Sequence, residues 1–290
     1  MAKLLNVLKD LSESVNGEPS EAKKLTEAVK EISRGLTGQE PEGKSLTELI
    51  DFTATNLKLT DERFKKIVER TYTALDVEIL DGVESIGAYA FYQYLLLTSL
   101  TTPESLKNIG ENAFMNCTNL ENVDLSNGVE SIGAYAFGSC NGLKNLVLGN
   151  KLKTIGNQAF NNCNNADFTS LTIPENVESI GAYAFYNNNL LEININVNGS
   201  IGEYAFSKSK SATLITIGTG VESIGANAFS SSTALTAIYI YAMTPPTLAN
   251  VTAFNYTNDC PIYVPAESLS VYKNASVWSS LSSRIQAIPE

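Results

Sequence analysis

The stretch VESIGAYAF occurs three times without change, at Val83–Phe91, Val129–Phe137 and Val177–Phe185. A fixed period in the twenties is typical of a solenoid, in which each coil buries its apolar side only against its neighbours. The core of the stretch, IGxxAF, has such a period and predicts a repeat solenoid. It begins at Ile86, Ile109, Ile132, Ile155, Ile180, Ile201 and Ile224, with spacings of 23, 23, 23, 25, 21 and 23 residues.

Each coil contains two stretches that we expect to form short strands. About six residues after each Phe comes an apolar pattern of the form LxxIxI, as in LENVDL from Leu120 and LTAIYI from Leu235. Its alternation predicts a strand, and the VESIG stretch predicts a second strand that ends at Gly. Stacked coils would align these strands in parallel, about 4.8 Å apart. Ile, Gly, Ala and Phe of IGxxAF are therefore expected at core and turn positions of every coil.

These repeats resemble the leucine-rich repeats of the BspA-like family, which carry the same IGxxAF…C…LxxIxI pattern. The resemblance covers roughly residues 74–240, and the tail from Thr244 onwards is similar to the closing segment of many such chains. It implies an α+β repeat solenoid of seven to eight repeats of about 23 residues with parallel β ladders. The family is known for surface adhesion and binding rather than for an enzymatic activity, so the resemblance implies no catalytic residues.

The two ends of the chain differ from the repeats and predict three parts. Residues 1–70 carry apolar residues at helical spacing, for example Leu4, Leu8 and Leu11, and are expected to form a helical segment for attachment or oligomerisation. Such helices must pack on each other, cap the first coil or pair with other copies of the chain. We expect a homo-oligomer through residues 1–60. Residues 71–241 would form the solenoid, and residues 242–290, with Trp278 as an apolar plug rather than a ligand platform, a C-terminal cap.

Composition excludes several function classes. The chain has 290 residues, no histidine and a formal net charge of −11, so we expect no nucleic-acid partner. No apolar run is long enough for a secretory signal or a membrane span, so we expect no membrane insertion. Phosphate loops, metal-ligand clusters and nucleophile elbows are missing from the sequence. We therefore predict that the protein is not an enzyme and needs no cofactor or metal.

Three columns of equivalent residues have structural interpretations. Cys117, Cys140 and Cys163 occupy one repeat position after the Phe, and we expect a ladder of buried thiols rather than a metal or reactive site. The other two columns alternate over two coils, one between Glu and Lys and one between Tyr and an amide, as an ancestral duplication of a coil pair predicts. They are Glu84, Lys107, Glu130, Lys153 and Glu178, expected to form ion pairs, and Tyr89, Asn112, Tyr135, Gln158 and Tyr183.

The outward positions of the LxxIxI strands form the predicted binding surface. These positions vary while the core repeats, and hydroxyl and amide side chains dominate them. Small polar groups on a rigid sheet suit many weak hydrogen bonds to a glycan or a protein, although each could equally be ordinary solvated surface. The predicted ligand-binding residues are Asn122, Asp124, Asn145, Ser170, Thr172, Glu192, Asn194, Thr216 and Tyr239.

Together these observations predict a non-enzymatic binding or adhesion protein whose partner is a host cell-surface glycan or protein. The first hypothesis is a bacteriophage virion component, such as a tail or head fibre, assembled in the bacterial cytoplasm with other virion proteins. It rests on an adhesion-type repeat joined to a helical N-terminus without a signal peptide. The alternatives are a bacterial cell-surface adhesin and an intracellular protein-binding scaffold.

Overall fold

The computed structural model describes residues 76–95, 97–126 and 128–289. The chain divides into two compact units, Met1–Leu80 and Asp81–Glu290. Of the first unit, the described part contains strand β1 (Asp76–Glu78). The helices predicted for residues 1–70 lie outside the described residues.

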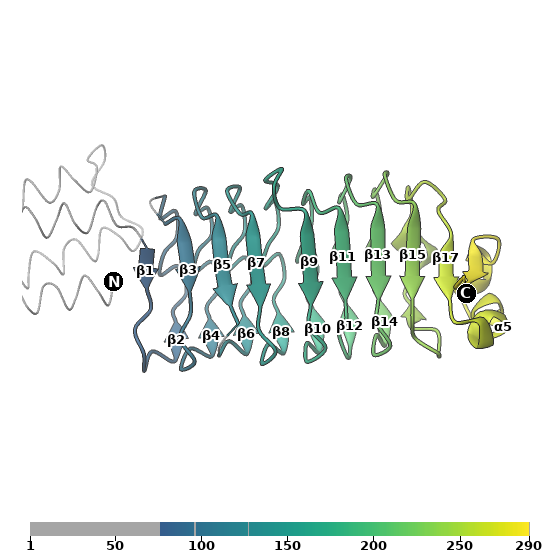
Figure 1. Cartoon of the computed structure of the whole chain (residues 1–290), viewed down its shortest axis with the longest axis horizontal. Coiled ribbons are helices and arrows are strands. Elements are labelled where there is room, and N and C mark those ends of the chain that lie inside the picture. Colours follow the sequence, from purple (N-terminus) through teal and green to yellow (C-terminus); the bar gives the residue numbers. More distant parts are fainter. Residues whose placement is uncertain (1–75, 96, 127, 290) are drawn as a thin grey trace, which may run out of the picture. The chain divides into compact units, whose positions relative to one another are not determined.

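The second unit is a parallel β-solenoid, as the repeats predict, and each coil contributes one long and one short strand (Figure 1). The long strands are β3 (Ser99–Thr101), β5 (Asn122–Leu125), β7 (Asn145–Leu148), β9 (Ser170–Ile173), β11 (Glu192–Ile195), β13 (Leu214–Ile217) and β15 (Ala237–Ile240). The short strands are β2 (Ser85–Ile86), β4 (Asn108–Ile109), β6 (Ser131–Ile132), β8 (Thr154–Ile155), β10 (Ser179–Ile180), β12 (Ser200–Ile201), β14 (Ser223–Ile224) and β16 (Thr247–Leu248).

Equivalent residues of neighbouring coils pair in register, so the repeat in sequence becomes a repeat in space. The short strands form one continuous sheet from β2 to β16. Ile132, for example, pairs with Ile109 on one side and Ile155 on the other. The long strands form a ladder in two pieces, with β3, β5 and β7 in one sheet and β9, β11, β13 and β15 in another.

The phenylalanines of IGxxAF stack along the interior of the solenoid. From Phe91 to Phe254 each ring lies parallel to the next, with centroids 5.0–5.7 Å apart. Offset-stacked rings at this separation gain contact energy beyond their buried area. One Phe per coil thus links every coil to its neighbours through the core.

The glycine of IGxxAF is required by the close approach of neighbouring coils. A Cβ atom on Gly133 would lie 2.7 Å from the backbone nitrogen of Glu111. Backbone atoms cannot yield as a flexible side chain can, so no larger residue fits at this corner. The same contact recurs at Gly110 and Gly156.

The C-terminal segment covers the last coils of the solenoid. It contains η1 (Val251–Phe254), β17 (Ile262–Val264), η2 (Ala266–Ser268), α5 (Leu269–Asn274), η3 (Trp278–Leu281) and β18 (Ile285–Ala287). Trp278 is buried, packs against Phe254 and Tyr272, and donates a 2.7 Å hydrogen bond from Nε1 to the carbonyl of Pro246. The indole therefore serves as the predicted apolar plug.

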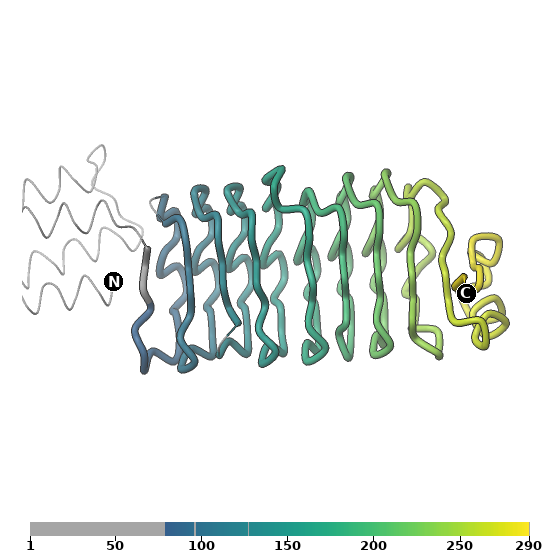
Figure 2. The backbone as a smooth tube through the Cα atoms, viewed as in Figure 1, coloured from purple at the N-terminus to yellow at the C-terminus, as the bar shows by residue number. Residues whose placement is uncertain are grey.

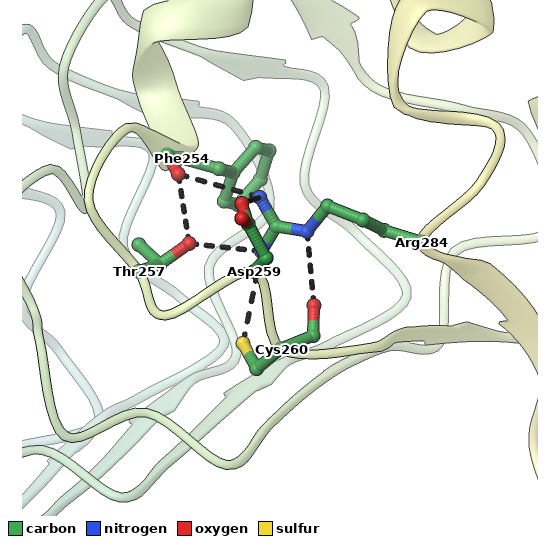
Figure 3. Close-up of polar contacts among 5 residues, drawn as sticks. All are labelled: Phe254, Thr257, Asp259, Cys260 and Arg284. Carbon is green, nitrogen blue, oxygen red and sulfur yellow. Dashed lines mark hydrogen bonds and ion pairs between the residues drawn. The ribbon is translucent and has the colours of Figure 1, made fainter.

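Arg284 ties the cap to the final turn of the solenoid (Figure 3). Its guanidinium donates to the carbonyl of Cys260 at 2.9 Å, to the carbonyl of Phe254 at 3.4 Å and to Oγ1 of Thr257 at 2.8 Å. The exposed carboxylate of Asp259 lies 4.0 Å from the same guanidinium. A planar group with several donors satisfies several loop acceptors at once, which a lysine could not do.

Candidate ligand-binding face

Six of the nine predicted binding residues lie on one continuous sheet. Ser170 and Thr172 on β9 pair with Glu192 and Asn194 on β11, and Thr216 on β13 pairs with Asn194 on one side and Tyr239 on the other. Their side chains are exposed or half-exposed, whereas the alternate residues of the same strands are buried. We call the outward side of β9, β11, β13, β15 and β17 the ladder face.

The other three predicted residues lie on the separate sheet that ends at β7. Asn145 donates a 2.7 Å hydrogen bond from Nδ2 to Oδ1 of Asn122, its in-register neighbour. Asp124 accepts a 2.9 Å hydrogen bond from the backbone nitrogen of Ser126, so this carboxylate stabilises a turn. The structure therefore does not bring all nine residues onto one sheet.

Two tyrosines that the sequence analysis did not assign to the binding surface lie beside Tyr239. The rings of Tyr239 and Tyr263 stack with centroids 4.9 Å apart, and Tyr241 lies 6.4 Å from Tyr239. We expected Tyr263 to surround Trp278 in the cap, and this expectation is wrong because β17 continues the long-strand ladder beyond β15. The alternation in the sequence PIYVP, with Ile262 and Val264 buried, was the available signal.

The charge of the ladder face favours a neutral ligand. Glu192 is exposed on β11, and no Lys or Arg occupies an outward position on the described strands β9 to β17. A phosphate, sulfate or carboxylate group on a ligand would therefore find no cation opposite it. Hydroxyl, amide and phenol groups, together with tyrosine rings, remain as the contact chemistry.

The cysteine column is buried and structural, as predicted. Cys117, Cys140 and Cys163 each donate a hydrogen bond from Sγ to a Phe carbonyl, at 3.1 Å, 3.2 Å and 3.2 Å. Burial raises the pKa of Cys117 and of Cys163 to about 12, and it raises the pKa of Cys140 well above its ordinary value. A nucleophilic or metal-binding role requires a thiolate, which these surroundings disfavour.

The Tyr and amide column is also packed as a ladder. Gln158 donates a hydrogen bond from Nε2 to the hydroxyl of Tyr135, and Tyr183 stacks on Tyr204 with centroids 4.7 Å apart. Burial and the neighbouring Tyr204 raise the pKa of Tyr183. These residues hold positive φ angles near 55°, which few residues other than Gly, Asn and Asp adopt readily.

The Glu and Lys column forms fewer ion pairs than its alternation suggests. Among the described residues of this column, only Lys153 and Glu130 lie within ion-pair distance, at 3.2 Å. Both side chains are partly exposed, so their contribution to stability is a few tenths of a kcal/mol. The column therefore adds little to the register that the backbone already defines.

Within the described part of the chain, no group of three or more His, Cys, Asp or Glu residues is arranged to hold a metal ion. No helix among these residues is both long and apolar enough to cross a membrane.

Solved structures with a similar fold are leucine-rich repeat proteins of bacteria. A T. pallidum leucine-rich repeat protein is 26% identical, with 54% of this chain and 74% of that chain covered and a TM-score of 0.49. A leucine-rich cell surface protein of Faecalibacterium prausnitzii is 16% identical, with 74% and 90% covered and a TM-score of 0.31. The pneumococcal vaccine antigen PcpA is 18% identical, with 72% of each chain covered and a TM-score of 0.30.

Comparison with curated proteins finds no match. The family model for the BspA type leucine-rich repeat region matches residues 64–169 and 164–275, with six copies of the repeat. These matches span well over half of the chain and include every coil described above. The chain therefore belongs to the BspA type leucine-rich repeat family.

Proposed function

We propose that this protein is a non-enzymatic binding protein that contacts a cell-surface glycan or protein through its ladder face. The observation that carries the proposal is the row of hydroxyl, amide and phenol side chains on β9 to β17, held outward at every coil. Most of these groups have no role in the core, because the alternate residues of the same strands fill it.

A rigid sheet of this kind suits an extended ligand. Neighbouring strands place equivalent side chains about 4.8 Å apart, so a ligand along the solenoid meets a new row of polar groups at each step. Each hydrogen bond contributes little by itself, and binding then depends on several coils acting together. The protein supplies preorganisation, because both ladders and the Phe stack fix the side chains before the ligand arrives.

The proposal is tested by measuring binding of the full chain to intact cells and to neutral oligosaccharides. We expect Tyr239→Ala to weaken binding at least tenfold, because Tyr239 lies at the contact between the polar rows and the tyrosines. Tyr256→Ala is the matched control, because Tyr256 is 76% exposed and lies outside the ladder face. Equal binding by wild type and Tyr239→Ala would contradict the proposal.

The nature of the ligand is tested on the same cells. Periodate treatment destroys a glycan ligand, and protease treatment destroys a protein ligand. The neutral character of the ladder face leads us to expect loss after periodate and little competition by sulfated oligosaccharides. Loss after protease alone would assign the surface to a protein partner.

We further propose a bacteriophage virion as the location of the protein, with the bacterial cell surface as the alternative. The virion proposal rests on residues 1–70, which lie outside the described residues. Light scattering of the full chain and of a chain that begins at Thr71 tests it. A closed oligomer that becomes a monomer on truncation supports a multivalent fibre, and monomers in both cases oppose it.

A further inference from the structure

One coil of the solenoid is longer than the others. From Ile155 of β8 to Ser170 of β9 the chain takes 15 steps, whereas from Ile132 of β6 to Asn145 of β7 it takes 13. The two extra residues fall within 164–167, because Phe168 occupies the buried position that Leu143 fills one coil earlier. They explain the spacing of 25 in the otherwise regular repeat.

The long-strand ladder is interrupted at this coil. In the described structure β7 pairs with β5 and β9 pairs with β11, but β7 and β9 do not pair with each other. The interval between β7 and β9 is visibly wider than that between other neighbouring long strands (Figure 1). On the opposite side β8 pairs with β10, and Phe160 stacks on Phe185 at 5.1 Å, so the backbone path continues there (Figure 2).

The interruption exposes apolar residues at the edge of β7. Leu146 and Leu148 are half-exposed, whereas the equivalent Val123 and Leu125 on β5 are buried. Val147 on the outer side is 49% exposed. Solvent therefore reaches the core side of the ladder at β7, which it does not do at β5.

Asparagine side chains bridge the two ends of the interruption. Asn165 donates a 3.2 Å hydrogen bond from Nδ2 to the carbonyl of Gly142, before the strands begin. Asn176 donates from Nδ2 to the carbonyl of Asn150, after the strands end. Single side-chain hydrogen bonds replace the cooperative backbone ladder that joins the other coils.

The core of the same coil contains a buried amide without partners. Asn188 takes the place of the Cys column after Cys163 and is 1% exposed. Neither Oδ1 nor Nδ2 of Asn188 has a hydrogen-bond partner in the described structure. A buried unpaired amide destabilises its surroundings, so this coil is weak in its core as well as in its ladder.

From these observations we propose that the coil between β8 and β9 is a conformational joint, at which the solenoid opens and bends before any other coil. The joint divides residues 81–289 into two cooperative halves connected by the short-strand sheet and the Phe stack. It also separates the outward residues of β5 and β7 from the ladder face, so bending would change their relative orientation. This inference stands independently of whether the ladder face binds a ligand.

Hydrogen exchange of the full chain tests the joint directly. We expect amides of β7 and β9 to exchange at least tenfold faster than those at the equivalent positions of β5 and β13, which have paired neighbours on both sides. Uniform protection across all four strands would overturn the proposal.

A variant without Ala166 and Asp167, combined with Phe168→Leu, restores the 23-residue spacing. We expect exchange in β7 and β9 to slow at least tenfold towards the rate of β5. The control replaces Ala166 and Asp167 by Gly and Ser, which keeps the length and should leave exchange fast. A folded deletion variant with unchanged exchange would overturn the proposal, and the wild-type comparison of β7 with β5 decides the matter if that variant does not fold.

Discussion

At the scale of single residues, the repeat determines which chemical groups meet inside the solenoid. The column that contains Cys117, Cys140 and Cys163 continues through Asn188 and Ser209, so one small polar side chain per coil faces the core. The thiols and Ser209 find carbonyl acceptors, whereas Asn188 does not. Small differences in side-chain length therefore decide whether a coil is satisfied or strained.

The pH dependence of stability follows from the thiols. Their folded-state pKa is raised, to about 12 for Cys117 and Cys163, whereas the unfolded value is near 9.0. Above pH 9 the unfolded chain releases thiol protons that the folded chain retains, so stability falls as the pH rises. We expect urea denaturation to show an additional loss of up to about 1.4 kcal/mol per pH unit per thiol between pH 9 and 11. The Cys140→Ala variant should show a shallower slope, and an identical slope would contradict this assignment.

Replacing the unpaired amide should stabilise the protein. Asn188→Cys introduces the side chain that hydrogen bonds in three preceding coils and removes two unsatisfied polar atoms. We expect a gain of about 1–3 kcal/mol in the free energy of unfolding, measured by chemical denaturation. The reciprocal change Cys163→Asn should cost a similar amount. A loss of stability in Asn188→Cys would show that the amide has a partner in solution.

At the scale of secondary-structure elements, the corner after each short strand limits how closely coils stack. Gly133 approaches the backbone of Glu111, whereas Gly87 at the same position of an earlier coil has no atom within 4 Å of a Cβ built on it. The same glycine in the same motif is therefore essential in one coil and replaceable in another.

This difference predicts two outcomes for one substitution. Gly133→Ala forces the coils apart and should cost roughly 2 kcal/mol or more in the free energy of unfolding, at the upper part of the range for overpacking. Gly87→Ala should be neutral within about 0.5 kcal/mol, because the methyl group enters open space. Thermal denaturation of both variants measures the difference, and equal destabilisation would contradict the stacking geometry.

At the scale of the whole molecule, the period of the sequence was sufficient to predict the solenoid, the two strands per coil, the Phe core and the buried thiols. These features repeat, so any error at one coil is corrected by the others. The interruption after β7 was visible only as a spacing of 25, because sequence does not show whether two extra residues loop out or separate strands.

The candidate site was predicted less completely than the fold. Alternation within LxxIxI identified the outward residues correctly, but Tyr263 was missed because its coil lacks the IGxxAF sequence. The ion pairs were overestimated because partner choice between exposed side chains depends on distances that a repeat does not encode. The division of Asn122, Asp124 and Asn145 from the other six residues likewise required the strand pairing.

The measurement that tests the ladder face most directly is cell binding by a full chain in which the face is blocked. Thr216→Arg places a long cation at the centre of the face, between Asn194 and Tyr239. Glu222→Arg is the control, because this exposed residue lies beside β14 on the short-strand side. We expect Thr216→Arg to reduce binding at least tenfold while Glu222→Arg binds at least as well as wild type. Unchanged binding by Thr216→Arg, in a variant that remains folded, would contradict the assignment of this surface.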